Sequence, residues 1–171
     1  MKASYFGLML LISMSLSGCS VFNLQQDGQE LEYQLNQIQQ WQVRGKLSVI
    51  SPEDAVTGYL TWQQDSEDFD LFLSGPFGQG SSRLEGNSTH ATLTLPNKNP
   101  VRAPSAEYLV AAYLGWEFPV LDLRYWVKGQ PSPSSDFTQV RNSLGLLESL
   151  KQHDWQVEFS RYQPQGETWL P

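Results

Sequence analysis

The chain has 171 residues, of which 40% are hydrophobic and 12% aromatic, and its formal net charge is −7 at pH 7. It carries 11 Lys and Arg against 18 Asp and Glu, so it lacks the basic surface that nucleic-acid binding requires, and we exclude that class. Because the sequence holds a single cysteine, no disulfide can form within the chain. The hydrophobic fraction suits one core or one apolar cavity, and composition does not separate the two.

The N-terminal segment has the features of an export signal. Residues 5–16 form an apolar run behind Lys2, of the length of a signal-peptide core and too short to span a bilayer. The run leads into "LSGC", residues 16–19, which resembles the bacterial lipobox, where a signal peptidase cuts before the cysteine and its sulfur is acylated. We therefore predict a signal peptide over residues 1–18 and a lipid anchor on Cys19.

The same resemblance indicates where the anchored protein works. Residue 20 is Ser, whereas Asp at that position would be associated with retention in the inner membrane of a Gram-negative bacterium. Two or more acyl chains give a stable anchor, at about 0.8 kcal/mol for each buried CH₂ group. The predicted location is the periplasmic face of the outer membrane, with residues 19–28 as a short tether and residues 29–171 as one domain.

An amphipathic helix followed by half-buried strands is predicted for the start of this domain. Leu31, Leu35 and Ile38 have helical spacing within residues 29–40. From residue 41 the hydrophobic period changes to two, and alternation predicts strands in the segments 41–50, 56–62, 69–73, 81–86 and 90–95. Turn signals about every 8 to 12 residues indicate an antiparallel sheet or barrel.

Two short helices are predicted to interrupt the strands. The first lies between a potential N-cap at Ser105 and a potential stop at Gly115. The second starts behind Pro119 and ends at Gly129. Beyond it, alternation in "DWQVEFSRY" (154–162) predicts a further strand, whereas residues 142–153 fit either a strand or a helix, with the strand preferred.

An apolar residue is predicted at the tip of one turn. The strand "LFL" (71–73) is followed by "SGPFG", in which Gly75, Pro76 and Gly78 favour a turn and leave Phe77 at its tip. An exposed ring of this size loses the roughly 1.5 to 3 kcal/mol of stabilisation that its burial would contribute. Either Phe77 folds back onto its own sheet, or it serves an apolar partner such as a membrane.

The order of these segments resembles the LolB family of outer-membrane lipoprotein acceptors. The resemblance runs from the lipobox through "WQVRGKLSV", "GYLTWQQ" and "DFDLFLSGPFG" to "DWQVEFSRY", and its most specific part is "GWEFPVLDLRYWVKGQP" (115–131). It implies a mainly β fold: an open antiparallel β-barrel, or half-barrel, with an apolar cavity lidded by short α-helices. It also implies that members receive the acyl chains of lipoproteins from a LolA-like periplasmic carrier and insert the lipoproteins into the outer membrane.

The resemblance implies two sites. One is a membrane-insertion loop of Gly75, Pro76, Phe77 and Gly78, where the family usually has Leu in place of Phe77. The other is an acyl-chain cavity, and the residues that we assign to it are Leu47, Val49, Leu60, Trp62, Leu71, Leu73, Leu93, Leu95, Val120, Leu123, Trp126, Val157 and Phe159. The tryptophans fit an ordinary core as well as a cavity wall. Family members continue with further strands beyond the position of Pro171, so we expect the domain described by this sequence to lack the last strands of the sheet.

Other classes of function have weaker support. His90 and His153 are far apart in the sequence and have no second His or Cys at ligand spacing, and Ser74 lacks the G-x-S-x-G pattern of hydrolases. We therefore expect no catalytic residues, no metal and no cofactor, and a monomer whose partners are the carrier, acyl chains and membrane lipid. Because the sequence has no Walker motif, transfer would run by differential affinity. Two alternatives remain open: a scaffold lipoprotein without a cavity, and a carrier of free lipids.

Overall fold

The computed structural model describes residues 21–50, 55–75, 80–115, 117–166 and 168–171. The predicted signal peptide, Cys19 and the turn residues Pro76, Phe77 and Gly78 lie outside the described residues. The helices and strands within them are α1 (Val21–Gln37), β1 (Gln40–Ile50), β2 (Ala55–Asp65), β3 (Asp68–Ser74), β4 (Ser82–Gly86), β5 (Ala91–Thr94), β6 (Val101–Ala103), α2 (Ala106–Leu114), α3 (Val120–Trp126), β7 (Phe137–Arg141), β8 (Leu147–Gln152), β9 (Trp155–Glu158), β10 (Gln163–Gln165) and β11 (Thr168–Leu170).

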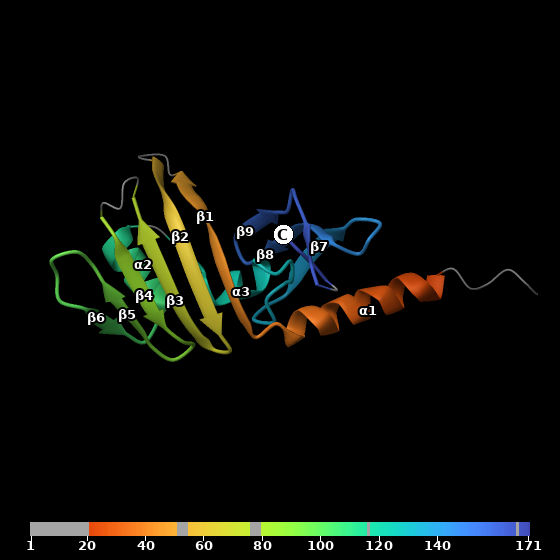
Figure 1. Ribbon diagram of the computed structural model, residues 1–171, viewed down its shortest axis with the longest axis horizontal. Coiled ribbons are helices and arrows are strands. Elements are labelled where there is room, and N and C mark those ends of the chain that lie inside the picture. The colour runs from red at the N-terminus through yellow and green to blue at the C-terminus, as the bar shows by residue number, and fades with distance from the viewer. Residues whose placement is uncertain (1–20, 51–54, 76–79, 116, 167) are drawn as a thin grey trace, which may run out of the picture.

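The six strands β1–β6 form one antiparallel sheet in which each strand lies beside the next (Figure 1). The pairing of β1 with β2 runs without a break from Gln40 opposite Asp65 to Ile50 opposite Ala55. The five predicted strands of this part are confirmed within a few residues. β6 was not predicted, because its three residues are too few for a recognisable alternation.

The two predicted short helices are also confirmed, including the caps of the first. Ser105 Oγ accepts a hydrogen bond from the backbone N–H of Tyr108 at 3.3 Å, and Gly115 ends α2 with a φ of 81°, in the left-handed region that glycine adopts freely. Both helices lie on one face of the six-stranded sheet, behind it in Figure 1. We call this the inner face and the opposite one the outer face.

A smaller sheet completes the C-terminal part of the molecule. β7, β8 and β9 pair antiparallel in that order, and β10 pairs with β11. The strand preferred within residues 142–153 is confirmed by β8, behind a turn at residues 142–146. β7, β10 and β11 were not predicted, since their exposed positions show no apolar alternation. The sheets are open, as expected for a half-barrel.

The N-terminal helix is longer than predicted. α1 begins at Val21, so residues 21–28, which we expected to form a short tether, are helical. Of the helix side chains described, only Leu35 is fully buried, at 3% exposure. The end of the helix is held by Lys128, whose Nζ donates to the carbonyl oxygens of Leu35 at 3.2 Å and Ile38 at 3.3 Å. The carbonyl of Leu35 also accepts the backbone N–H of Ile38 at 3.2 Å, so Lys128 adds a second bond to it.

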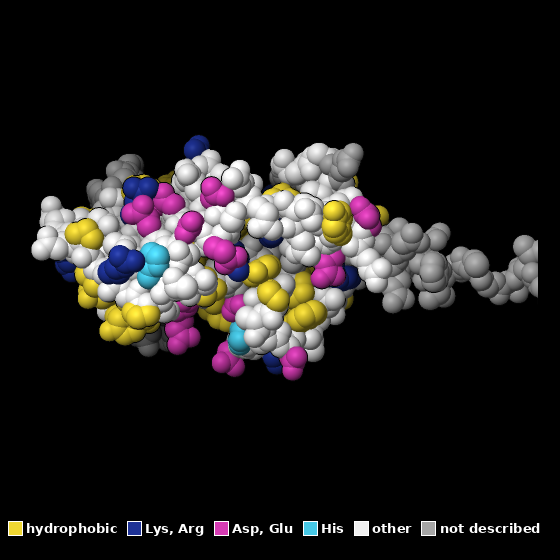
Figure 2. All heavy atoms as spheres, turned by 90° about the horizontal axis from the view of Figure 1, so that it is seen from below, with side chains coloured by type: hydrophobic (Ala, Val, Ile, Leu, Met, Phe, Trp, Pro, Cys, Tyr) yellow, Lys and Arg dark blue, Asp and Glu magenta, His cyan; other side chains and the backbone are white. Residues whose placement is uncertain are grey.

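The surface is mixed in character. Seen from below, acidic side chains are spread over the molecule, and hydrophobic side chains gather at the end that carries β5, β6 and α2 and again near the middle (Figure 2). Within the described part of the chain, no helix is long and apolar enough to cross a membrane.

Candidate functional site

The inner face of the six-stranded sheet is apolar because alternate residues of its strands point to it. The register places Trp62 of β2 opposite Leu71 of β3, and Leu71 opposite Leu84 of β4. These three side chains are 1 to 4% exposed. The predicted cavity residues that lie in this core cluster or pack against it are Leu60, Trp62, Leu71, Leu93, Leu95, Val120 and Leu123.

The remaining predicted residues divide into two groups, so the thirteen do not form a single cluster. Trp126, Val157 and Phe159 belong to a second cluster built on Leu147 and Leu150, and Leu123 contacts both clusters. Leu47, Val49 and Leu73 belong to neither cluster and are half-buried. They lie toward the end of the sheet where β1 and β3 finish, which we call the upper end (Figure 1).

The upper end of the inner face is apolar but only partly covered. Val43 lies opposite Trp62 on this face, yet it is 37% exposed. Gly45 lies opposite Leu60, and a Cβ atom added there would meet no atom of the described residues within 4 Å. We name this region the open end and define it by Val43, Gly45, Leu47, Val49, Leu60 and Leu73. An apolar surface with free space above it can accept an apolar ligand without directional hydrogen bonds.

The helices cover part of the inner face: α2 lies against β5 and β6, and α3 packs on the same core. Leu109 and Val110 of α2 and Val120 of α3 are each at most 2% exposed in the first core cluster. Sequence reasoning included Val120 in the cavity but missed Leu109 and Val110. Their place in the most apolar stretch of the predicted helix 105–115 was the available signal.

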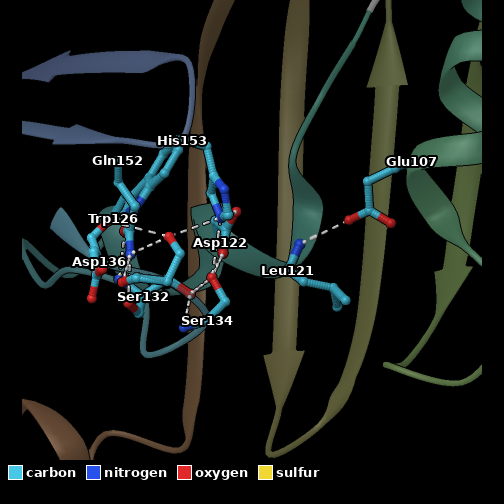
Figure 3. A network of polar contacts seen from close by, with 10 residues as sticks. Glu107, Leu121, Asp122, Trp126, Ser132, Ser134, Asp136, Gln152 and His153 are labelled. Atoms are coloured by element: carbon cyan, nitrogen blue, oxygen red, sulfur yellow. Dashed lines mark hydrogen bonds and ion pairs between the residues drawn. The ribbon is translucent and has the colours of Figure 1, made fainter.

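Polar contacts attach α3 to its neighbours on several sides (Figure 3). Glu107 of α2 accepts a hydrogen bond from the backbone N–H of Leu121, in the first turn of α3, at 3.2 Å. The N-cap residue of α3, Pro119, makes no side-chain cap of its own. At the other end of α3, Trp126 Nε1 donates to Gln152 Oε1 at 2.9 Å. The Gln152 amide also bonds the backbone N–H and carbonyl of Ser132, at 2.9 and 2.6 Å.

Two basic residues extend these attachments. Arg124 Nη1 lies 2.7 Å from Oε2 of Glu67, a residue of the turn between β2 and β3. Arg124 Nη2 donates a hydrogen bond to the hydroxyl of Tyr125 at 2.9 Å. Burial alone would lower the pKa of Arg124, but its contacts with Glu67 and Tyr125 outweigh that effect and leave the pKa raised. Burial, aided by the charge of Arg124, lowers the pKa of Lys128.

A cavity of about 250 Å³ lies where α1, α3 and the β2–β3 turn meet. Its lining includes Gln64, Glu67, Arg124, Tyr125 and Lys128. These polar and charged groups do not suit an acyl chain, because burying them against hydrocarbon would cost their hydration. The open end of the inner face is therefore the better candidate for an apolar ligand.

His153, whose side chain is 45% exposed, takes part in a Ser, His and Asp group. His153 Nε2 lies 3.1 Å from Ser135 Oγ and 3.4 Å from Asp122 Oδ2. In a hydrolytic triad the carboxylate binds the opposite ring nitrogen, Nδ1, so this arrangement does not activate a nucleophile. Its role is to join α3 to the turn between β8 and β9. In the described part of the chain, no three His, Cys, Asp or Glu side chains are grouped to hold a metal.

The structure defines an open antiparallel half-barrel whose apolar inner face is partly covered by two helices. Comparison with known proteins identifies the family. The family model for the outer-membrane lipoprotein LolB matches residues 39–171. The chain therefore belongs to the LolB family.

Curated relatives agree with this assignment. The outer-membrane lipoprotein LolB of a Pseudomonas fluorescens strain is 36% identical over 165 residues, which cover 91% of this chain and 80% of that protein. The protein of the same name from Pseudomonas syringae pv. syringae is 38% identical over 142 residues, covering 83% and 69%. That from Pseudomonas aeruginosa is 37% identical over 138 residues, covering 81% and 67%.

Proposed function

We propose that this protein is an acceptor on the outer membrane that takes lipoproteins from a soluble periplasmic carrier by their acyl chains and inserts them into the membrane. The observation that carries the proposal is the open end of the inner face. Leu47, Val49 and Leu73 give it an apolar floor, while Gly45 leaves space above that floor.

The physical requirements of such transfer match this surface. An acyl chain in water must be shielded, and each CH₂ group that leaves water contributes about 0.8 kcal/mol. Because this driving force is not directional, the site needs apolar area rather than placed donors and acceptors. Transfer would then proceed by a difference in affinity between carrier, acceptor and membrane.

The anchor of the proposed acceptor is Cys19. Its support is the "LSGC" sequence behind the apolar run and the naming of the relatives as outer-membrane lipoproteins. Membrane fractionation tests this directly: Cys19→Ala should release the processed protein from the membrane, and the parent should carry fatty acid on Cys19. Unchanged membrane retention of Cys19→Ala, with no fatty acid on the parent, would contradict the assignment.

The second element of the proposed function is the loop of residues 75–78, which we propose enters the membrane. Gly75 directly follows β3 at the upper end of the sheet, beside the open end of the inner face. A loop inserted there would bring the open end close to the acyl region of the bilayer.

A two-stage assay separates this function from its alternatives. Labelled lipoprotein is bound to a LolA-like carrier, mixed with the unlipidated mature chain, and then presented to liposomes, and each step is scored. We expect both receipt and delivery. A scaffold lipoprotein would show neither step. A carrier of free lipids would take up phospholipid in preference to the lipoprotein.

A further inference from the structure

The outer face of the six-stranded sheet carries a group of exposed apolar and basic side chains that runs from the middle of β1 to its upper end. Ile50 is 81% exposed, Tyr59 58% and Phe72 42%. Arg44 and Lys46, on the outer face of β1, are exposed as well. We call these five residues the outer-face patch.

The strand register makes the patch continuous. Lys46 lies directly opposite Tyr59, in the row next to the one that joins Arg44, Thr61 and Phe72. Side chains in neighbouring rows of one face of a sheet are within reach of each other when they are aromatic or long. Ile50 extends the group along β1 to the last paired position of the strand.

Arg44 and Lys46 form no ion pair within the described residues. Asp65 and Asp68 lie at the lower end of β2 and β3, and Glu53 and Asp54 follow β1 in the sequence, outside the described residues. Arg83, in the row of Phe72, is neutralised by its ion pair with Asp70. The middle of the outer face therefore presents two cations without an ion pair among the described residues, on a chain whose net charge is −7.

We propose that the outer-face patch binds the surface of a bilayer that contains anionic lipid. Aromatic side chains and the long stems of Lys and Arg prefer the boundary between water and hydrocarbon, and free cations attract anionic headgroups. The proposal rests on the proposed function in one respect: the loop that follows Gly75 leaves from the same end of the sheet.

Vesicle binding tests the basic part of the patch. The unlipidated mature chain (Cys19→Ala) is sedimented with vesicles of phosphatidylethanolamine and phosphatidylglycerol, or with neutral phosphatidylcholine vesicles. Each free cation near an anionic surface contributes roughly a five-fold gain in binding. Arg44→Gln with Lys46→Gln should therefore weaken binding to the anionic vesicles about 25-fold and leave binding to the neutral ones unchanged.

The matched control removes the same charge elsewhere. Arg102 on β6 and Lys151 on β8 are exposed, and the double change to Gln gives the same net charge. An equal loss of binding in this control, or no loss in the patch variant, would overturn the proposal. Weaker receipt from the carrier without membranes, with vesicle binding intact, would make the patch a protein-docking surface and would also overturn it.

A second pair of variants tests the apolar part. Phe72 on the patch and Tyr113 on α2 have nearly equal exposures, 42% and 44%. Phe72→Ser should weaken binding to both kinds of vesicle by several fold, and Tyr113→Ser should not. Equal binding by the two variants would count against the patch. Uptake of a fluorescent fatty acid should stay unchanged in every patch variant, so a failure of the acyl-binding function would be recognised separately.

Discussion

The guanidinium of Arg124 on α3 forms an ion pair at 2.7 Å with the carboxylate of Glu67, 57 positions earlier in the chain. This contact fastens the helix to the β2–β3 turn, at the lower end of the sheet. Lys128, one turn further along the chain, binds the carbonyls that end α1. The lower end of the inner face is therefore tied to α1 and α3 by polar contacts, and its cavity is lined by polar and charged groups, so we propose the upper end as the site for an apolar ligand.

Removal of the Glu67 carboxylate should loosen α3 without unfolding the protein. Glu67 is 62% exposed, and ion pairs of this kind contribute at most about 1 kcal/mol. We expect Glu67→Gln to lower the free energy of unfolding by less than that, and amide hydrogen exchange to become faster in α3. Asp70→Asn, which breaks the ion pair with Arg83 on the outer face, serves as the control. Equal exchange in α3 in both variants would contradict the proposed fastening.

The buried amide of Gln152 should contribute far more to stability. It is 1% exposed, and its side chain bonds Trp126 Nε1, the backbone of Ser132 and the carbonyl of Ser135. Gln152→Leu leaves these buried groups without partners, and we expect a loss of roughly 2 to 4 kcal/mol in the free energy of unfolding measured with urea. Gln156→Leu, at an exposed position of β9, should change it by less than about 0.5 kcal/mol.

Tyr162 predicts a loss of stability at alkaline pH. Burial raises the pKa of its hydroxyl to about 12, and the hydroxyl donates to the carbonyl of Leu147 at 2.8 Å. Between the unfolded pKa of about 10 and this value, the folded state holds the proton more tightly, so the stabilising contribution is complete below pH 10 and is lost as the pH rises to 12. The free energy of unfolding of the parent should therefore fall more steeply over this range than that of Tyr162→Phe. Parallel curves for the two proteins would contradict this assignment.

The strands and helices with strong periodicity could be predicted from the sequence. β1 to β5 follow the alternation of apolar residues, and α2 lies between Ser105 and Gly115 because those residues cap a helix. The second helix ends at Trp126, three residues before the predicted Gly129, which has a φ of 74° in the turn that follows. A Cβ atom at Gly129 would lie 2.7 Å from the Tyr162 hydroxyl. The closeness of Gly129 to Tyr162 depends on the tertiary structure and could not be predicted from the sequence.

The arrangement of the site could be predicted only in part. Periodicity correctly indicates that Leu60, Trp62 and Leu71 share a face, but it does not show which part of that face the helices cover. The division of the predicted cavity residues into two clusters depends on where α3 lies. That position is set by contacts distant in sequence, such as Arg124 with Glu67 and Lys128 with α1. Local sequence patterns do not indicate such long-range contacts.

The proposed insertion loop predicts a variant that receives but does not deliver. Phe77→Glu should leave folding and receipt from the carrier nearly unchanged and impair delivery to liposomes, because a carboxylate does not enter the apolar part of the bilayer. Phe77→Leu should preserve both steps. The two-stage assay checks this. Equal delivery by Phe77→Glu and the parent would contradict the insertion role, and a large loss of thermal stability in Phe77→Glu would show that the ring packs against its own sheet.

Uptake of a fluorescent fatty acid by the unlipidated mature chain tests the central claim, acyl-chain binding at the open end of the inner face. Leu47→Glu places a charge in the open end, whereas Ser48→Glu places the same charge on the exposed outer face of the same strand. We predict saturable uptake by the parent and by Ser48→Glu, and a loss of at least about ten-fold in affinity for Leu47→Glu, because a carboxylate must lose its hydration to stay beside an acyl chain. Absence of uptake by the folded parent, or equal uptake by folded Leu47→Glu and Ser48→Glu, would contradict the account.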